Sequence, residues 1–255
     1  MGYKEVLIFL AVKHHGDWDE IFNAIQNREF GTPEEIQSVI KNIKSKVLTI
    51  LDDNYPEYLK GLYRSPFVLF YYGDISLIDS IENNIAVIGS RDYSEYGKNM
   101  TQYLVKDICA RYIVVSGLAR GIDGIAHRTS IENGGKTIAV LGSGIDYCHP
   151  KENLDIYNEI KTNHLLISEY PNDEVPKPEY FPWRNRLIAA FSKGLLVTEA
   201  HSRSGTQITV EFALQMNREI MCVPYRITDE TFNNKLISEG AYLVESGEDI
   251  AYIMK

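Results

Sequence analysis

Glycine, serine and arginine follow three short apolar segments of this sequence. Gly89-Ser90-Arg91 follows the first, the turn 116–124 with Arg120 follows the second, and Gly142-Ser143-Gly144 follows the third. Glycine lets the backbone approach a phosphate closely, and the free N–H groups at the start of a following helix attract anions. Guanidinium groups bind phosphate through paired hydrogen bonds. These residues therefore predict a broad anion-binding rim, although tight strand-to-helix turns alone would use the same glycines.

Aromatic residues and arginines are interleaved in the segment 180–186, which has the sequence Tyr-Phe-Pro-Trp-Arg-Asn-Arg, and Lys151 follows the third turn. Single-stranded nucleic acid is bound by such pairs, because guanidinium groups hold phosphates and aromatic faces stack unpaired bases with about 1–3 kcal/mol each. Phe181 and Trp183 could equally be core residues, and surface arginines commonly pair with acids. The coincidence of cations with strand ends favours nucleic-acid binding.

Common phosphate-binding and catalytic patterns do not fit. The glycines of the second turn lack the G-x-G-x-x-G spacing of dinucleotide-binding proteins, and no Walker-type loop occurs. Asp123 and His127 are four residues apart on an expected helix but have no third metal ligand, so we interpret Asp123 as a helix cap. Glu211 with Arg186 is the one pair that we consider for acid–base chemistry. We expect no catalytic residue, no metal and no cofactor.

Short β-branched apolar segments must position these turns. Six of them are apolar throughout, as in strands covered on both faces, and helical stretches separate most of them; they span 85–88, 112–115, 137–141, 165–167, 195–197 and 220–223. This alternation predicts an α/β fold with a doubly wound, mostly parallel, Rossmann-like sheet. Ligands of such sheets bind outside the carboxyl ends of the strands, near the point where the strand order reverses.

Three helical patterns precede the predicted sheet. The segment 3–13 is apolar, Asp17 begins a segment with acids in its first turn, and Thr32-Pro33 with Glu35 forms an N-terminal capping pattern. Extended segments are expected at 46–51 and 66–72. We therefore predict a small helical N-terminal domain over 1–48 and a Rossmann-like domain over 49–255.

The composition limits the classes of protein that remain. The 255 residues carry 26 Lys and Arg against 35 Asp and Glu, and this net charge of -9 argues against binding nucleic acid by bulk charge. The acidic excess lies in 1–82 and 223–255, so a local cation cluster between them is compatible with it. Three scattered cysteines indicate free thiols in a reducing cytoplasm. The apolar run 6–12 is much shorter than the roughly 20 residues that a membrane span needs.

Longer motifs of this sequence resemble the DprA/Smf DNA-processing family. They occur in the family's order over roughly residues 50–250: Asp53-x-Tyr55-Pro56, Pro66-x-x-Leu69-Phe70, Gly89-Ser90-Arg91, Ser116 to Asp123 with Ala126-His127, Gly142-Ser143-Gly144, Phe181-Pro182-x-Arg184-Asn185-Arg186, Glu199-Ala200 with Ser204-Gly205, and Leu236-Ile237 with Gly240-Ala241. Tyr225 and Phe232 replace two glycines that are usual in the family, which predicts a different shape for the loop 225–234.

The resemblance implies a non-enzymatic, cytoplasmic recombination mediator that binds and protects single-stranded DNA and assists RecA loading in natural transformation, or competence, and related recombination. By motif, its DNA-binding residues would be Gly89, Ser90, Arg91, Ser116, Gly117, Gly121, Lys151, Arg184 and Arg186. The family forms homodimers, and Ile237 and Leu243 would lie on the dimer surface near the RecA contact. The domain 49–255 would be the DNA-processing domain, and we expect no C-terminal winged helix and no membrane partner.

A nucleotide phosphoribohydrolase resembling the LOG family is the alternative. Its Pro-Gly-Gly-x-Gly-Thr-x-x-Glu motif has a partial counterpart in Ser204-Gly205-Thr206 and Glu211. The double glycine is missing here, and Glu211 lies too far beyond the threonine. A plain dinucleotide-binding protein is a third hypothesis, which the missing glycine fingerprint disfavours.

Overall fold

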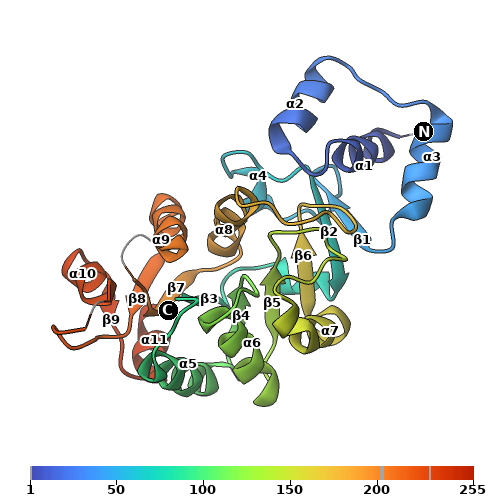
Figure 1. Cartoon of the computed structure of the whole chain (residues 1–255). Helices are drawn as coiled ribbons and strands as arrows, with labels where there is room; N and C mark the ends of the chain where they lie inside the picture. The colour runs from blue at the N-terminus through green and yellow to red at the C-terminus, as the bar shows by residue number, and fades with distance from the viewer. Residues whose placement is uncertain (1, 202–203, 230) are drawn as a thin grey trace.

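The computed structural model describes residues 2–201, 204–229 and 231–255. In these ranges the strands form a nine-stranded sheet in the order β1-β2-β6-β5-β4-β3-β7-β8-β9 (Figure 1). The strands are β1 (Lys46–Thr49), β2 (Val68–Gly73), β3 (Asn84–Gly89), β4 (Ile113–Ser116), β5 (Thr137–Val140), β6 (Leu165–Ser168), β7 (Gly194–Glu199), β8 (Glu219–Cys222) and β9 (Tyr242–Leu243). Neighbours from β6 to β9 pair in parallel, whereas β2 is antiparallel to both β1 and β6. The predicted α/β, doubly wound and mostly parallel fold is confirmed.

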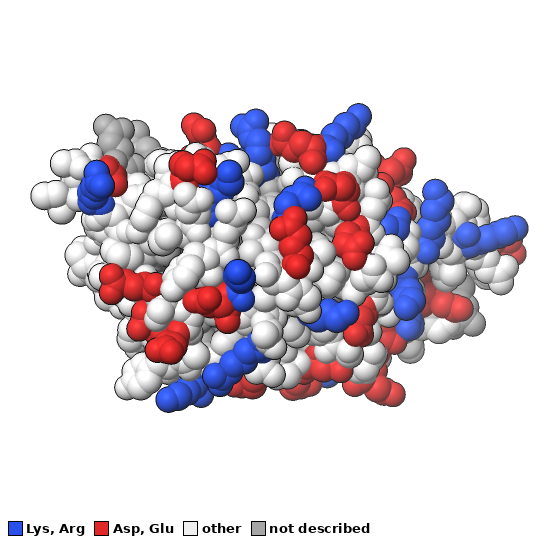
Figure 2. All heavy atoms as spheres, turned by 90° about the horizontal axis from the view of Figure 1, so that it is seen from below, with Lys and Arg blue, Asp and Glu red and all other residues white. Residues whose placement is uncertain are grey.

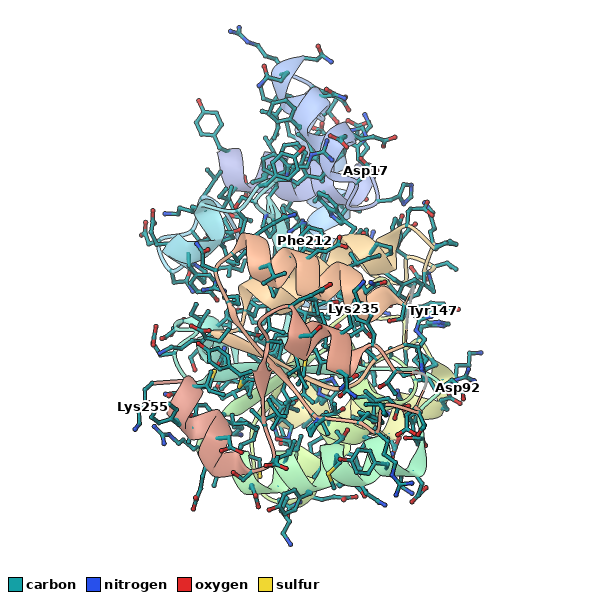
Figure 3. The ribbon with its side chains drawn as sticks, turned by 90° about the vertical axis from the view of Figure 1, so that its left-hand side faces the viewer. Asp17, Asp92, Tyr147, Phe212, Lys235 and Lys255 are labelled. Carbon is teal, nitrogen blue, oxygen red and sulfur yellow. The ribbon has the colours of Figure 1, made fainter. Side chains whose placement is uncertain are left out.

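The order of the strands reverses between β3 and β7. From β3 the chain moves outward through β4 and β5 to β6, and it then returns to the other side of β3 with β7 and β8. The carboxyl ends of β3 and β7 are therefore adjacent, and the connections that leave them diverge. This is the place where an open α/β sheet binds its ligands. In Figure 3, Asp92 after β3 and Tyr147 after β5 lie on the same side of the molecule, opposite Lys255.

Helices cover both faces of the sheet because the strand residues alternate between two apolar cores. Along β3, Ala86 and Ile88 belong to the core under α8, α9 and α10, whereas Ile85 and Val87 belong to the core under α5, α6 and α11. The helices are α4 (Glu57–Lys60), α5 (Glu95–Ile108), α6 (Ile122–Glu132), α7 (Leu154–Asn163), α8 (Tyr180–Ala190), α9 (Gly205–Gln215), α10 (Asn233–Ser238) and α11 (Gly247–Ile253), with short 3-10 turns at Ile75–Ile78 and Lys151–Asn153.

Three N-terminal helices lie at the end of the molecule opposite α10 (Figure 1). They are α1 (Tyr3–Lys13), α2 (Trp18–Gln26) and α3 (Pro33–Asn42). Asp17 caps α2, and Thr32 with Glu35 forms the expected capping box at α3. Their apolar residues share a core with α7 and with the sheet residues Phe70 and Leu166. The division into domains 1–48 and 49–255 stays a prediction.

A histidine is buried where α6 packs on the sheet. His127 is fully buried, and its Nδ1 lies 2.6 Å from the hydroxyl of Thr137. Burial, reinforced by the positive charges of His164 and Arg184, lowers the pKa of His127 to about 3. The folded protein therefore holds this imidazole neutral at pH values at which an unfolded chain protonates it.

α8 carries a buried ion pair. The Nη2 atom of Arg186 lies 2.5 Å from Oε1 of Glu169, and their side chains are only 2% and 6% exposed. The ring of Trp183 covers the guanidinium, with its centroid 4.2 Å from the guanidinium carbon. Burial raises the pKa of the Glu169 carboxyl above its ordinary value, although Arg186 opposes this shift. Each charge depends on the other for its compensation in the core.

The neutral state of His127 predicts a loss of stability in acid. Between pH 8 and pH 5 the unfolded chain gains a proton that the folded chain does not, which costs about 2 kcal/mol of unfolding free energy. We expect the stability difference between the native protein and a His127→Gln variant to shift by this amount, in favour of the variant, over the same interval. Urea unfolding at the two pH values measures the shift, and a difference independent of pH would contradict the assignment.

The buried pair predicts an asymmetric response to substitution. Arg186→Ala leaves Glu169 uncompensated and should cost roughly 3–5 kcal/mol of unfolding free energy. The double variant Arg186→Met/Glu169→Leu removes both charges and should recover most of that loss. Urea denaturation of the three proteins makes the comparison. A double variant as unstable as the single one would show that packing, rather than charge compensation, controls the site.

Candidate functional site

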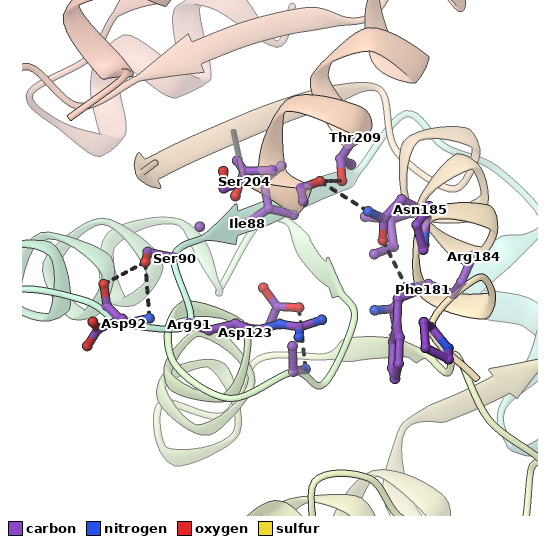
Figure 4. Close-up of a pocket in the computed structure, with 17 residues that line it drawn as sticks. Ile88, Ser90, Arg91, Asp92, Asp123, Phe181, Arg184, Asn185, Ser204 and Thr209 are labelled. Atoms are coloured by element: carbon purple, nitrogen blue, oxygen red, sulfur yellow. Dashed lines mark hydrogen bonds between the residues drawn. The ribbon is translucent and has the colours of Figure 1, made fainter. Parts of the chain in front are cut away.

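A cavity of about 640 Å³ opens at the carboxyl ends of β3 and β7, and we call it the switch-point pocket (Figure 4). The loop 89–92 after β3 forms one wall, α8 forms the facing wall, and the start of α9 closes the third side. Arg91 extends across the cavity toward Phe181. Its guanidinium carbon lies 5.3 Å from the centroid of that ring, and no carboxylate among the described residues pairs with it. The pocket therefore presents an exposed cation beside an aromatic face.

The loop that carries Arg91 is fixed to β7 by Glu199. This residue is 1% exposed, and its carboxylate accepts hydrogen bonds from the backbone N–H of Ser94 at 3.0 Å and from its hydroxyl at 2.8 Å. The carbonyl of Glu199 also accepts from the N–H of Ser90 at 2.8 Å. The hydroxyl of Tyr225 donates a further bond to the carboxylate at 3.1 Å. The motif placed Glu199 near the site, but its role in positioning the loop was not predicted.

The same loop packs closely on the turn before α6. Gly121 has a φ of +84°, and a Cβ atom at this position would lie 2.4 Å from the carbonyl oxygen of Ser90. The N–H of Ile122 donates to that carbonyl at 3.1 Å. Only glycine allows both the backbone conformation and this approach. The first and second glycine-rich turns therefore form one continuous surface around Arg91.

Arg184 forms the charged floor of the pocket. It is 4% exposed, and its Nη1 donates to the carbonyl of Gly117 at 2.6 Å and to that of Val140. Burial lowers the pKa of its guanidinium to about 10, with Asp123 opposing the shift, so Arg184 remains charged at neutral pH. Its edge faces both the switch-point pocket and a smaller neighbouring cavity.

Asp123 has a different role from the predicted helix cap. Its carboxylate accepts hydrogen bonds from the N–H groups of Gly117 at 3.1 Å and Ala119 at 3.4 Å, so it holds the turn before the helix. The N-cap of α6 is Gly121. Burial raises the pKa of Asp123, whereas Arg184 and the two amides oppose this shift. The capping interpretation was therefore wrong.

A side pocket of about 240 Å³ adjoins the switch-point pocket and shares Arg91, Phe181 and Arg184 with it. Gly117 and Pro150 line this side pocket. Lys151 follows Pro150 at the start of a 3-10 turn and is exposed, but it does not itself line either cavity. Of the predicted cations, Arg91 and Arg184 border both cavities, and Lys151 is the chain neighbour of two lining residues, Pro150 and Glu152.

Two predicted DNA-binding residues do not reach these cavities. The hydroxyl of Ser116 is fully buried and donates to the carbonyl of Val87 at 2.7 Å. Arg186 points away from Arg184 into the core, because positions two apart on a helix differ in direction by about 200°, and it pairs there with Glu169. We therefore correct the predicted site by removing both side chains. The remaining predicted residues that line cavities are Gly89, Ser90, Arg91, Gly117, Gly121 and Arg184, and Lys151 follows the lining residue Pro150.

The residue pairs considered for other chemistry are used differently. His127 bonds Thr137, and Asp123 bonds loop amides. Within 2–201, 204–229 and 231–255, no three His, Cys, Asp or Glu residues are placed to hold a metal ion. Glu211 is exposed on α9, whereas Arg186 is buried against Glu169, so this acid–base pair does not form.

The predicted interaction surface lies at the far edge of the sheet. Leu243 is 47% exposed on the outermost strand β9, and Ile237 is half-buried on α10. In the described part of the loop 225–234, Asn234 exchanges two hydrogen bonds with the backbone of Tyr225, at 3.0 and 2.7 Å. Phe232 is 8% exposed. Glu230 of this loop lies outside the described residues.

No helix in the described part of the chain is both long and apolar enough to cross a membrane. On the face shown in Figure 2, basic and acidic side chains are interspersed, and neither kind forms a patch. That face therefore offers no concentrated positive charge to an anion.

Comparison with known proteins agrees with this geometry. A family model described as DNA recombination-mediator protein A matches residues 46–255. The DNA processing protein DprA of Streptococcus pneumoniae is 42% identical over 204 residues, which are 79% of this chain and 72% of that protein. Its X-ray structure superposes with a TM-score of 0.80 and 34% identity, covering 97% of this chain and 92% of the other.

A second solved structure is that of DNA processing protein A from Helicobacter pylori, a protein described for its single-stranded DNA binding mode. It superposes with a TM-score of 0.74 and 27% identity, covering 83% of this chain and 95% of the other. The family resemblance predicted from the motifs is confirmed. The chain belongs to the DNA recombination-mediator protein A family, the DprA/Smf family.

Proposed function

We propose that this protein binds single-stranded DNA in the switch-point pocket and the side pocket. Family membership gives it a DNA-processing, recombination-mediator role. The observation that carries the proposal is the exposed guanidinium of Arg91, which lies beside the ring of Phe181 at the point where the strand order reverses. Arg91, Lys151 and Arg184 would hold phosphates, and the ring of Phe181 would stack an unpaired base.

The size of the cavities favours a single strand over a duplex. The two joined cavities have volumes of about 640 and 240 Å³, which suit a few unpaired nucleotides. A duplex keeps its bases paired inside, so it could offer only backbone to these cavities and would leave the aromatic wall unused. The glycines at 89, 117 and 121 let backbone approach the strand closely. The related Helicobacter pylori protein, with its described single-stranded DNA binding mode, supports this choice.

We propose that the protein binds its DNA without a chemical reaction. The buried carboxylate of Asp123 is occupied by loop amides, and that of Glu199 by Ser94 and Tyr225. Both carboxylates are thus used to shape the pocket. The relatives carry names of DNA processing proteins rather than of enzymes, in agreement with this proposal.

The bound strand would be passed to a RecA-type recombinase, which the protein helps to load in transformation or related recombination. We propose that this occurs in the cytoplasm and on a homodimer. The exposed edge strand β9, with Leu243 and the neighbouring Ile237, is the surface that would pair two copies. An unpaired strand edge with exposed apolar side chains is suited to association with another chain.

Binding of a short oligonucleotide tests the DNA site. With three phosphates neutralised, log K for an oligo-dT of about six nucleotides should fall with log salt with a slope near −2, at about −0.7 for each phosphate. Arg91→Ala should weaken binding roughly tenfold or more and reduce the slope by about 0.7, and Lys151→Ala should act in the same direction.

Arg111→Ala is the matched control. This exposed arginine precedes β4, so it lies at the amino ends of the parallel strands, whereas the proposed site lies at their carboxyl ends. Fluorescence anisotropy at several salt concentrations measures these changes. Undiminished binding by the Arg91 and Lys151 variants would exclude this site.

Sedimentation tests the proposed dimer surface. Leu243→Arg places a charge on the exposed edge strand and should shift the protein from dimer to monomer at micromolar concentration, while leaving its thermal stability nearly unchanged. Short oligo-dT affinity should be retained, because β9 is separated from β3 by β7 and β8. If the variant sediments as the native protein does, β9 is not the dimer surface.

A further inference from the structure

A second groove continues from the proposed DNA site along α6. It has a volume of about 610 Å³ and lies between the start of α6 and the turn 152–156, and Arg91 lines it. Arg91 also lines the switch-point pocket and the side pocket. Arg120 and Glu152 are shared between the side pocket and this groove. The three hollows are therefore consecutive parts of one surface, and we call the third the α6 groove.

The lining of the α6 groove suits a chain of phosphates. Three guanidinium groups border it, those of Arg91, Arg120 and Arg128. Tyr93, whose side chain is 40% exposed, stands at its wall beside the Arg91 loop and offers a ring for a base. Gly121 and Gly124 leave two positions at the helix start that line the groove without side chains.

Two of these guanidinium groups, those of Arg120 and Arg128, form exposed ion pairs in the structure. Arg120 lies 3.9 Å from Glu152, with side chains 65% and 54% exposed, and Arg128 lies 2.7 Å from Asp155, with side chains 48% and 60% exposed. Exposed pairs of this kind contribute little to stability. A phosphate in the groove can therefore take over each guanidinium, while its carboxylate partner turns into solvent. The pairs keep the groove close to neutral until a polyanion enters.

The spacing of the two arginines matches a stacked strand. α6 begins at Ile122, so the six steps from Ile122 to Arg128 span roughly 9 Å along the helix axis, and Arg120 lies in the turn before the helix. Nucleotides of a stacked strand advance by about 3.4 Å each, so about three of them cover this interval. The groove is thus long enough to require nucleotides beyond those in the switch-point and side pockets.

We propose that the α6 groove is an extension of the DNA site, in which Arg120 and Arg128 hold two further phosphates of the same strand after displacing Glu152 and Asp155. This inference rests on the proposed function. It predicts that the site binds long strands through contacts that a short strand cannot make. The two carboxylates act against the strand, so their removal strengthens binding.

Two oligonucleotide lengths separate this inference from the proposed function. For Arg128→Ala, which lines the α6 groove but not the side pocket, we expect binding of a twenty-nucleotide oligo-dT to weaken roughly tenfold and its salt slope to fall by about 0.7, while binding of a six-nucleotide oligo-dT stays unchanged. Asp155→Asn, which removes the partner of Arg128, should strengthen binding of the long strand only. Arg111→Ala is again the control, and the comparison is made at each length separately, so that the larger number of binding registers on the long strand cancels.

The outcomes are distinct. If Arg128→Ala binds the long strand with native affinity and native salt slope, the α6 groove is not used, whatever the result at Arg91. If it weakens both lengths equally, Arg128 belongs to the short-strand site and the extension is wrong. If Arg91→Ala leaves both lengths unaffected, the proposed function itself fails. Thermal melting of each variant checks the fold, which the exposure of Arg128 and Asp155 should preserve.

Discussion

The junction between β3 and β7 is the constraint on which the rest of the site depends. The carboxylate of Glu199 is removed from solvent and has no lysine or arginine partner within ion-pair distance in the described chain. It accepts hydrogen bonds from Ser94 and Tyr225, and Nε2 of His201 lies 3.4 Å from its Oε1. Ser94 lies at the start of α5, and Tyr225 lies in the segment after β8. The carboxylate at the end of β7 therefore links three segments of the chain. The loop with Arg91 runs between β3 and Ser94, which Glu199 holds in place. Because this loop is short, its backbone has little freedom. A cation on a fixed loop loses less conformational entropy when it meets a phosphate.

Three arginines near the site differ in burial and in function. Arg184 and Arg186 are buried, whereas Arg91 is exposed. Arg184 and Arg186 lie two positions apart on one helix, yet the first borders the cavities and the second pairs with Glu169 in the core. The guanidinium of Arg184 has carbonyl oxygens as its bonded partners, and the carboxylate of Asp123, which lines the same pocket, interacts with its charge. Arg91 and Lys151 are exposed by comparison. In the proposed site, the buried cation would set a fixed position for one phosphate, and the exposed side chains would adjust to the phosphates that follow it.

Local sequence patterns predicted the parts of this fold that local physics determines. The β-branched segments became β3 to β8, because their apolar runs are visible locally although their pairing partners lie far along the chain, and Thr32 with Glu35 capped a helix as expected. The antiparallel pairing of β2 and the two-residue strand β9 depend on partners far along the chain. Within the site, the glycine-rich turns and Arg91 were predicted from strand ends. The burial of Arg186, the clamp at Glu199 and the turn-holding role of Asp123 were not, since each depends on a partner that only tertiary packing supplies.

The net charge of -9 determines how such a protein can bind a polyanion at all. The long-range electrostatic interaction of this negative protein with a polyanion is unfavourable. At physiological salt, however, interactions between exposed charges more than about 8 Å apart are largely screened. In the proposed function, affinity would therefore arise from contacts inside the cavities, where Arg91 and Arg184 would meet a phosphate directly. A partner that penetrates the cavities would gain these contacts, whereas one that stays outside would meet only a surface of mixed charge. An exterior of mixed charge around cations that line cavities would thus admit a flexible strand and disfavour a rigid duplex.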